Sequence, residues 1–168
     1  MNKFYKSVIL LFTIVLLNGC GFYSFTGASI SPDIKSISIQ QFPNLAPLVQ
    51  PTLSQVFTLA LRDKFVSQSN LSLVQTNGDL NIEGEITGYS NQPIAIQGNQ
   101  QAALNRLTIT VKVRFFNKKD NKQDFESTFT RYRDYSSQSN LSEVESGLIE
   151  EINKDLVEDI FNKSVVNW

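Results

Sequence analysis

The sequence predicts an α+β fold, a two-layer sandwich in which two helices pack on one face of a roughly four-stranded, mostly antiparallel or mixed sheet. Two segments carry apolar residues at helical spacing, and several others alternate apolar and polar residues with the period of two that is typical of a half-buried strand. The strand segments lie mostly between the two helical ones. Both helices can then bury their apolar stripes on the same sheet face, which leaves the other face free to meet a partner.

The first residues have the layout of a bacterial signal peptide. Lys3 and Lys6 form a basic segment, and the residues from Val8 to Leu17 form an apolar run. A helix that spans a membrane needs about 20 apolar residues, and this run is shorter. We therefore expect residues 1–19 to be removed as a signal peptide.

Cys20 is the expected first residue of the mature chain. Leu17-Asn18-Gly19-Cys20 resembles the lipobox of bacterial lipoproteins, and Cys20 is the only cysteine in the sequence. One acyl chain anchors a protein only marginally, so two or three chains on Cys20 would be needed for a stable anchor. The alternative interpretation is an ordinary secretory signal peptide followed by an incidental cysteine.

The expected mature chain, residues 20–168, is predicted to be a single domain. It contains no internal repeat and no Pro/Ser-rich linker, and its length suits one hydrophobic core. Without residues 1–19 the chain has 13 basic and 16 acidic residues, a net charge of −3. An acidic chain of this kind is not expected to bind nucleic acid.

The first half of the domain predicts a strand followed by a helix. Lys35–Phe42 alternates with Ile37 and Ile39 on one face, and the prolines that follow end the strand. From Pro51 to about Val66 the apolar residues recur at spacings of three and four, and Pro51 suits the first position of a helix.

The next segments predict a short strand, a turn and a longer strand. Residues 71–74 are apolar, residues 77–79 read Asn-Gly-Asp, and Leu80–Ile86 alternates again. Gly84 and Gly88 fall on the inward positions of this strand. They indicate close packing by a helix or a bulge.

A loop is expected over residues 90–105, which are rich in Asn, Gln and Gly. Leu107–Phe115 is the clearest strand, and a charged hairpin turn leads from it to a return strand over Phe125–Tyr135. Arg131 and Arg133 have the same parity as the phenylalanines of the return strand. We therefore expect a bulge that resets the two faces midway.

The last segment predicts a second amphipathic helix of roughly 20 residues. Ser142 to Glu145 has the pattern of a capping box, and apolar residues at helical spacing run from Val144 to Phe161. The opposite side of this helix is acidic, as expected for a solvent-exposed face.

The sequence offers few groups that catalysis would need. It contains no histidine, which excludes Ser-His and Cys-His nucleophile pairs, and it has no glycine-rich phosphate loop. Glu83 and Glu85 are a carboxylate pair of the kind that a glycosidase uses, but we interpret them as part of a solvated strand face, because no aromatic-rich cleft pattern accompanies them. We expect no enzyme activity, no metal and no cofactor beyond the covalent lipid on Cys20.

The basic residues near the clearest strand suggest an anion-binding site. Arg106, Lys112 and Arg114 share its polar face, and Lys118 and Lys119 follow in the turn. Arginine and lysine suit phosphate groups because of their charge and donor geometry. The alternative is a charged strand face that prevents aggregation.

Runs along the whole mature chain resemble the LptE family, the outer-membrane lipoproteins of lipopolysaccharide assembly. These runs are CGFYSFTG from Cys20, KSISIQQFPNLAP, LSQVFTLALRDKF, GDLNIEGEITGY, NRLTITVKVRFFN and EDIFNKSVVNW. None of them is a catalytic motif. The resemblance implies two helices against a four-stranded sheet, and a non-enzymatic protein that plugs the large β-barrel LptD, helps it assemble and binds lipopolysaccharide.

The leading hypothesis is therefore a subunit of the outer-membrane lipopolysaccharide translocon, whose partners are an LptD-like barrel, lipopolysaccharide and, through its acyl chains, the membrane. We expect it to be lipid-anchored in the outer membrane and to face the periplasm or the barrel lumen. The alternative is a stand-alone outer-membrane lipoprotein that binds another envelope ligand or polymer through the free sheet face. A hydrolase that uses the paired carboxylates is a third hypothesis.

Overall fold

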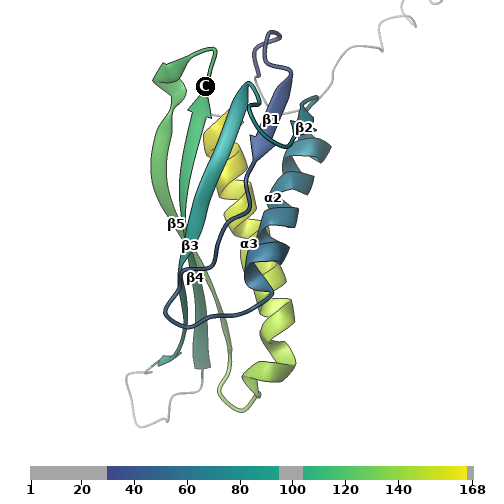
Figure 1. Ribbon diagram of the computed structural model, residues 1–168. Helices are drawn as coiled ribbons and strands as arrows, with labels where there is room; N and C mark the ends of the chain where they lie inside the picture. The colour runs from purple at the N-terminus through teal and green to yellow at the C-terminus, as the bar shows by residue number, and fades with distance from the viewer. Residues whose placement is uncertain (1–29, 95–103, 166–168) are drawn as a thin grey trace, which may run out of the picture.

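The computed structural model describes residues 30–94 and 104–165, so the expected signal peptide and Cys20 lie outside this part. Figure 1 shows an open sheet with two helices side by side on one of its faces. The elements in chain order are β1 (Ser36–Ile39), α2 (Leu53–Gln68), β2 (Ser72–Val74), β3 (Leu80–Ile94), β4 (Leu104–Asn117), the 3₁₀ helix η2 (Asn121–Gln123), β5 (Phe125–Ser136) and α3 (Leu141–Val165). The predicted α+β class with both helices on one sheet face is confirmed.

The sheet is mixed, with the strand order β2-β1-β3-β4-β5. β1 pairs in parallel with β2 and β3, whereas β3, β4 and β5 form an antiparallel meander. The sheet has five strands, close to the roughly four that the sequence predicts, and the short strand expected over residues 71–74 is the edge strand β2. β1 connects to β2 through α2, as a parallel pair requires.

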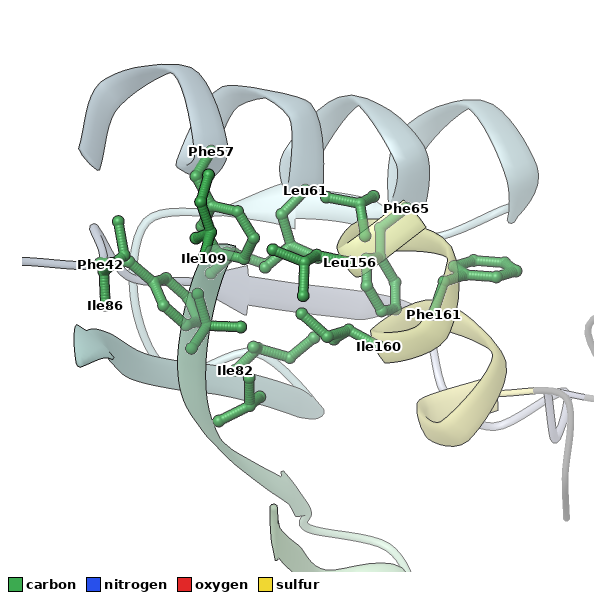
Figure 2. Close-up of a cluster of buried hydrophobic side chains, with 14 of the residues drawn as sticks. Phe42, Phe57, Leu61, Phe65, Ile82, Ile86, Ile109, Leu156, Ile160 and Phe161 are labelled. Carbon is green, nitrogen blue, oxygen red and sulfur yellow. The ribbon is translucent and has the colours of Figure 1, made fainter. Parts of the chain in front are cut away.

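The core lies between the sheet and the two helices. The inward residues of β4 are all buried, as the alternation of this strand predicts: Leu107, Ile109, Val111, Val113 and Phe115. Helix α2 contributes Phe57, Leu61 and Phe65, and helix α3 contributes Leu156 and Ile160 (Figure 2). The Phe65 ring packs edge-on against Phe161 with 5.0 Å between the ring centroids.

The two glycines of β3 have different roles. A Cβ atom on Gly84 would lie 2.5 Å from Cε1 of Phe42, a fully buried side chain, and would also meet the carbonyl oxygen of Lys112. The predicted close packing is therefore made by Phe42, from the segment after β1, and not by a helix. The predicted bulge is also present, because the register of β3 against β4 shifts between Ile86 and Gly88.

The loop expected over residues 90–105 is shorter than predicted. β3 continues to Ile94 and β4 begins at Leu104. The two strands pair through this region, from Ser90 opposite Thr108 to Ile94 opposite Leu104. The backbone ladder alone is enough to extend both strands, although their side chains here have no hydrophobic alternation. Pro93 is tolerated because β1 does not extend beside this end of β3.

The bulge expected in the return strand is absent, because β5 pairs with β4 in one continuous register from Phe125 to Ser136. Arg131 and Arg133 therefore face helix α3, on the same side as Phe125 and Phe129. The carboxylates of α3 make this position favourable for them. The sequence correctly placed Arg131 and Arg133 on the same strand face as the phenylalanines, and the prediction of a bulge was wrong.

Both helices begin at other residues than the sequence suggests. α2 starts at Leu53, and the side-chain oxygen of Gln50 accepts the N–H groups of Thr52 and Leu53 at 2.8 and 3.0 Å, so Pro51 precedes the first turn. α3 starts at Leu141, which places Ser142 inside the helix and not at its cap. The Gln50 side chain thus defines the start of α2, whereas at the start of α3 the backbone N–H of Glu143 donates to the carbonyl oxygen of Asn140. α3 is also longer than predicted.

Candidate functional site

The polar face of the sheet, on the side away from the helices, carries the three strand cations that the sequence singles out. Arg106, Lys112 and Arg114 occupy alternate positions of β4 on this face. The register places carboxylates beside them: Glu83 and Glu85 on β3, and Glu126 and Asp134 on β5. This part of the sheet holds three cations against four carboxylates, so it has no excess of positive charge.

Lys112 and Arg114 lie together beside a shallow cavity of about 400 Å³. The Lys112 ammonium is 2.6 Å from a Glu126 carboxylate oxygen, and Nη2 of Arg114 is 3.0 Å from Glu83 Oε1. Hydrogen bonding to Lys112 lowers the pKa of Glu126 below its ordinary value. Both cations are thus neutralised locally, although their side chains remain 42% and 52% exposed and accessible to a ligand.

The same cavity brings together the two carboxylates that suggest a hydrolase. It is lined by Gln40, Gln41, Pro43, Glu83, Gly84, Glu85, Lys112 and Arg114. No aromatic ring that would support a sugar is in this lining, and Glu83 is held by Arg114. The cavity is therefore better suited to bind charged or hydrogen-bonding groups than to bind a sugar ring.

Arg106 lies apart from this pair, six residues along β4, which is roughly 20 Å in an extended strand. Its guanidinium donates to both carboxylate oxygens of Asp134, at 2.7 and 2.9 Å, and lies 3.6 Å from the centroid of the Tyr132 ring. The hydrogen bond from Arg106 lowers the pKa of Asp134. This bidentate, stacked arrangement fixes Arg106 more firmly than Lys112 or Arg114.

Lys118 and Lys119 lie at the opposite end of β4, in the turn to β5. Lys118 Nζ donates to the carbonyl oxygen of Asn77 at 2.9 Å, and Lys119 Nζ is 3.8 Å from Asp79. Asp79 also accepts the backbone N–H groups of Lys35 and Ser36, and the first of these is the main reason that its pKa is lowered. These two lysines thus join the turn to the strands beside it, and the five predicted cations do not form one cluster.

Sequence reasoning missed the ion pairs that join β5 to α3. Arg131 donates to both carboxylate oxygens of Asp159 at 2.6 and 2.7 Å, and Arg133 donates to Glu151 and Asp155, each at 2.8 Å. The signal was present in the sequence, as two arginines of inward parity opposite an acidic helix face. It was lost because we assigned that helix face to solvent.

A second missed contact joins β3 to the start of α3. Tyr89 is buried, and its hydroxyl donates to the carboxylate of Glu145. Burial, followed by this contact, raises the pKa of the Tyr89 hydroxyl well above its ordinary value. No pattern in the sequence pairs these residues, because the bulge in β3 decides which way Tyr89 points.

An uncharged surface lies where the chain enters α2. No charged residue occurs between Lys35 and Arg62. Several large apolar side chains of this segment are exposed: Leu45, Leu48 and Val49 in the loop before α2, and Val56 and Leu59 on its first turns. We call these five residues the apolar entry surface. Exposed apolar surface is typical of a site that contacts another molecule, and these residues, which lie close together in the sequence, are the candidate for such a site.

Two further features of the described residues bear on function. Within residues 30–94 and 104–165 no helix is both long and apolar enough to cross a bilayer. The same residues contain no group of three or more His, Cys, Asp or Glu side chains arranged to hold a metal ion. The polar sheet face and the apolar entry surface are therefore the features that we consider as candidate sites.

Comparison with solved structures finds several proteins that resemble this one, of which the two with TM-scores above 0.5 share its fold. A minor lipoprotein from Acinetobacter baumannii is 18% identical, with 77% of this chain and 91% of that chain covered and a TM-score of 0.47. Hypothetical protein CT253 from Chlamydia trachomatis is 11% identical, with 80% and 99% covered and a TM-score of 0.55. Uncharacterized lipoprotein B from Nitrosomonas europaea is 14% identical, with 85% and 88% covered and a TM-score of 0.52. At these identities the similarity concerns the fold alone.

Comparison of sequences identifies the family. No curated protein sequence matches the chain significantly. Residues 34–164, which run from just before β1 almost to the end of α3, match the family described as LptE, Lipopolysaccharide-assembly. This match spans every helix and strand that the structure describes, so the chain belongs to the LptE family of lipopolysaccharide assembly.

Proposed function

We propose that this protein is a non-enzymatic lipoprotein subunit of the outer-membrane lipopolysaccharide translocon, where it plugs an LptD-like barrel, helps it assemble and binds lipopolysaccharide. The observation that carries the proposal is the family match over residues 34–164. Cys20 would carry the acyl chains, and the domain of residues 20–168 would face the periplasm or the barrel lumen.

The apolar entry surface is the part of the molecule that we assign to the barrel. Leu48 and Val49 are 56% and 62% exposed, and both lie between prolines that stiffen the loop. A contact surface benefits from such rigidity because less conformational entropy is lost on binding. The absence of charge also avoids the desolvation cost that buried charges would add.

We assign the ligand contact to Lys112 and Arg114, with Arg106, Lys118 and Lys119 as further cations of the same strand and turn. A lipopolysaccharide phosphate carries up to about two negative charges, compared with one for a carboxylate. It would therefore compete with Glu126 for Lys112 and with Glu83 for Arg114. Both ion pairs are exposed to solvent, which screens their attraction, so exchange would be easy.

Opposite charge changes test this ligand site. Lys112→Glu with Arg114→Glu should weaken binding of purified lipopolysaccharide about tenfold, because two attractive charges become repulsive. Glu83→Gln with Glu126→Gln should strengthen it, because the competing carboxylates are gone. Circular dichroism of both variants should match that of the unchanged protein. If both double variants bind lipopolysaccharide with unchanged affinity, Lys112 and Arg114 do not bind this ligand and serve only to stabilise the strand face.

Depletion of the protein distinguishes the proposal from the alternative of a stand-alone lipoprotein that binds another envelope ligand or polymer. If the protein serves the translocon, its loss should reduce lipopolysaccharide at the cell surface. Surface labelling of lipopolysaccharide before and after depletion measures this. A normal surface level would favour the alternative, to which the nearly balanced charges of the sheet face are equally suited.

A further inference from the structure

Strand β5 forms a long open edge of the sheet. It is the last strand in the sheet order and has 12 residues, whereas β2 at the other edge has only three. Open edges in natural proteins are usually protected by proline, lysine, a bulge or shortness. β5 contains no proline, glycine or lysine, pairs without a bulge, and has one charged residue, Glu126, in its first half. This edge is therefore suited to accept another strand.

The backbone groups that an added strand would need point to the open side. The carbonyl oxygen of Lys112 points toward β3, where it would meet a Cβ atom on Gly84. In an antiparallel ladder the N–H and C=O groups of a residue point to the same side. Lys112 pairs with Thr128, so the N–H and C=O groups of Thr128 point away from β4. The carbonyl of Tyr132, four pairs farther along, accepts a hydrogen bond from the Arg133 side chain and not from β4.

A groove of about 710 Å³ is lined by the first residues of β5, the turn before them and the last turns of α3. Figure 1 shows the start of β5 and the end of α3 at the upper end of the molecule. The floor of the groove contains the partly buried rings of Phe125 and Phe129. Lys163 Nζ lies 4.9 and 5.9 Å from the centroids of these rings, and Asp159 and Asn162 complete the helix side. The groove therefore offers aromatic surface with polar groups along one wall, next to unpaired strand backbone.

The described chain begins beside one end of this groove. Ile30 and Ser31 line a cavity of about 360 Å³ together with residues of the β4–β5 turn, including Lys119 and Gln123. Gln123 also lines the groove between β5 and α3. Ile30 and Ser31 also line a second cavity with Ser69, Asn70 and Leu71, which lie between α2 and β2. The residues that precede Ile30 thus join the fold between the β4–β5 turn and the end of α2, within reach of the start of β5.

Those preceding residues have the length and the pattern of a strand that fits this edge. Residues 21–29 read GFYSFTGAS and span about 30 Å when extended, whereas Phe125 and Phe129 are only about 13 Å apart along β5. In an extended chain Tyr23 and Phe25 share one face, and Ser24 and Thr26 share the other. β5 has the matching arrangement, with phenylalanines on the helix side and threonines on the polar side.

Other occupants fit less well. Residues 166–168 span about 10 Å, too little for these three residues to pair along the edge. A second copy paired symmetrically through β5 about Thr130 would place Glu126 opposite Asp134 of that copy, and like charges in this position are unfavourable. The chain's own N-terminal segment avoids both problems.

We propose that residues 21–29 pair antiparallel with the free edge of β5 and place Tyr23 and Phe25 in the groove against Phe125 and Phe129. The segment that follows the lipid-bearing Cys20 then closes the sheet edge and fixes the side of the domain that faces the membrane. This inference requires neither a barrel nor lipopolysaccharide. Its failure would therefore leave the proposed function unchanged, and the reverse also holds.

Disulfide trapping in the full-length lipidated protein tests which edge is covered. Thr26→Cys combined with Thr128→Cys or Thr130→Cys should form an intramolecular disulfide under mild oxidation, seen as a mobility shift that reduction reverses. The matched control is Thr26→Cys with Leu73→Cys on β2, the opposite edge, and it should not form one. Equal trapping at both edges, or none at β5, would overturn the proposal. A disulfide-linked dimer of Thr130→Cys alone would indicate a second copy instead.

Hydrogen exchange tests the strand pattern. In a variant with Tyr23→Lys and Phe25→Lys the added strand should be lost. The amide hydrogen of Thr128 should therefore exchange at least about tenfold faster in this variant than in the unchanged protein. Phe22→Lys, which has the opposite parity, should leave the protection in place. If Thr128 exchanges rapidly in all three proteins, or if Phe22→Lys has the same effect as the double variant, the segment does not pair as proposed. Protection that persists in all three would point to a different occupant.

Discussion

At the scale of single residues, glycines show how tightly the site is built into the core. Gly84 lines the cavity together with Glu83 and Glu85, at a position of β3 where a side chain would point inward. The Phe42 ring occupies the space where its side chain would be. The wall of the candidate site is thus one strand thick, with the core immediately beneath it.

Two glycine substitutions should therefore have opposite effects on stability. Gly84→Ala should destabilise the fold by about 1–3 kcal/mol, because the new methyl group meets Phe42 and the Lys112 carbonyl. Gly147, on an exposed turn of α3, has nothing within 4 Å of an added Cβ atom. Gly147→Ala should stabilise the protein by roughly 0.5–1 kcal/mol through helix propensity.

Thermal unfolding measures the stability of both variants. In a protein of this size, each kcal/mol shifts the midpoint of unfolding by about 2–4 °C. A lower midpoint for Gly84→Ala and a higher one for Gly147→Ala are expected. If Gly84→Ala unfolds at the same temperature as the unchanged protein, Phe42 can move aside and the wall is less constrained than the geometry indicates.

At the scale of elements, hydrophobic alternation predicted β4 and both helices because burial alone determines their faces. It predicted β3 and β5 less well. The outer halves of β3 and β4 have no hydrophobic pattern, yet Ser90–Ile94 pairs with Leu104–Thr108, since the backbone ladder continues without it. Strand pairing of this kind depends on the partner strand and leaves little local signal.

The same limit applies to the candidate site. Alternation correctly placed Lys112 and Arg114 on one polar face, because that follows from their positions in a single strand. It could not show that Glu83 and Glu126 lie beside them, since that depends on the registers of two other strands. Nor could it show that Arg131 and Arg133 bind α3, because the acidic face of that helix was assigned to solvent.

At the scale of the whole molecule, different parts of the surface have different chemistry. The polar sheet face contains several ion pairs, whereas the segment that leads into α2 carries no charge between Lys35 and Arg62. Under the proposed function, the polar sheet face would exchange these ion pairs for contacts to an anionic lipid, and the uncharged segment would contact a protein partner. This asymmetry is the feature that connects the fold most directly to the proposed role in the translocon.

Affinity purification of the lipidated protein from detergent-solubilised outer membrane tests this central claim most directly. We expect a large β-barrel protein to co-purify in near-equal amount, and Leu48→Asp with Val49→Asp to reduce it strongly, because both charges would be buried at the contact. Val66→Asp, on an exposed and already charged turn of α2, is the matched control and should retain the barrel. If no barrel protein accompanies the unchanged protein, the assignment to the translocon is contradicted.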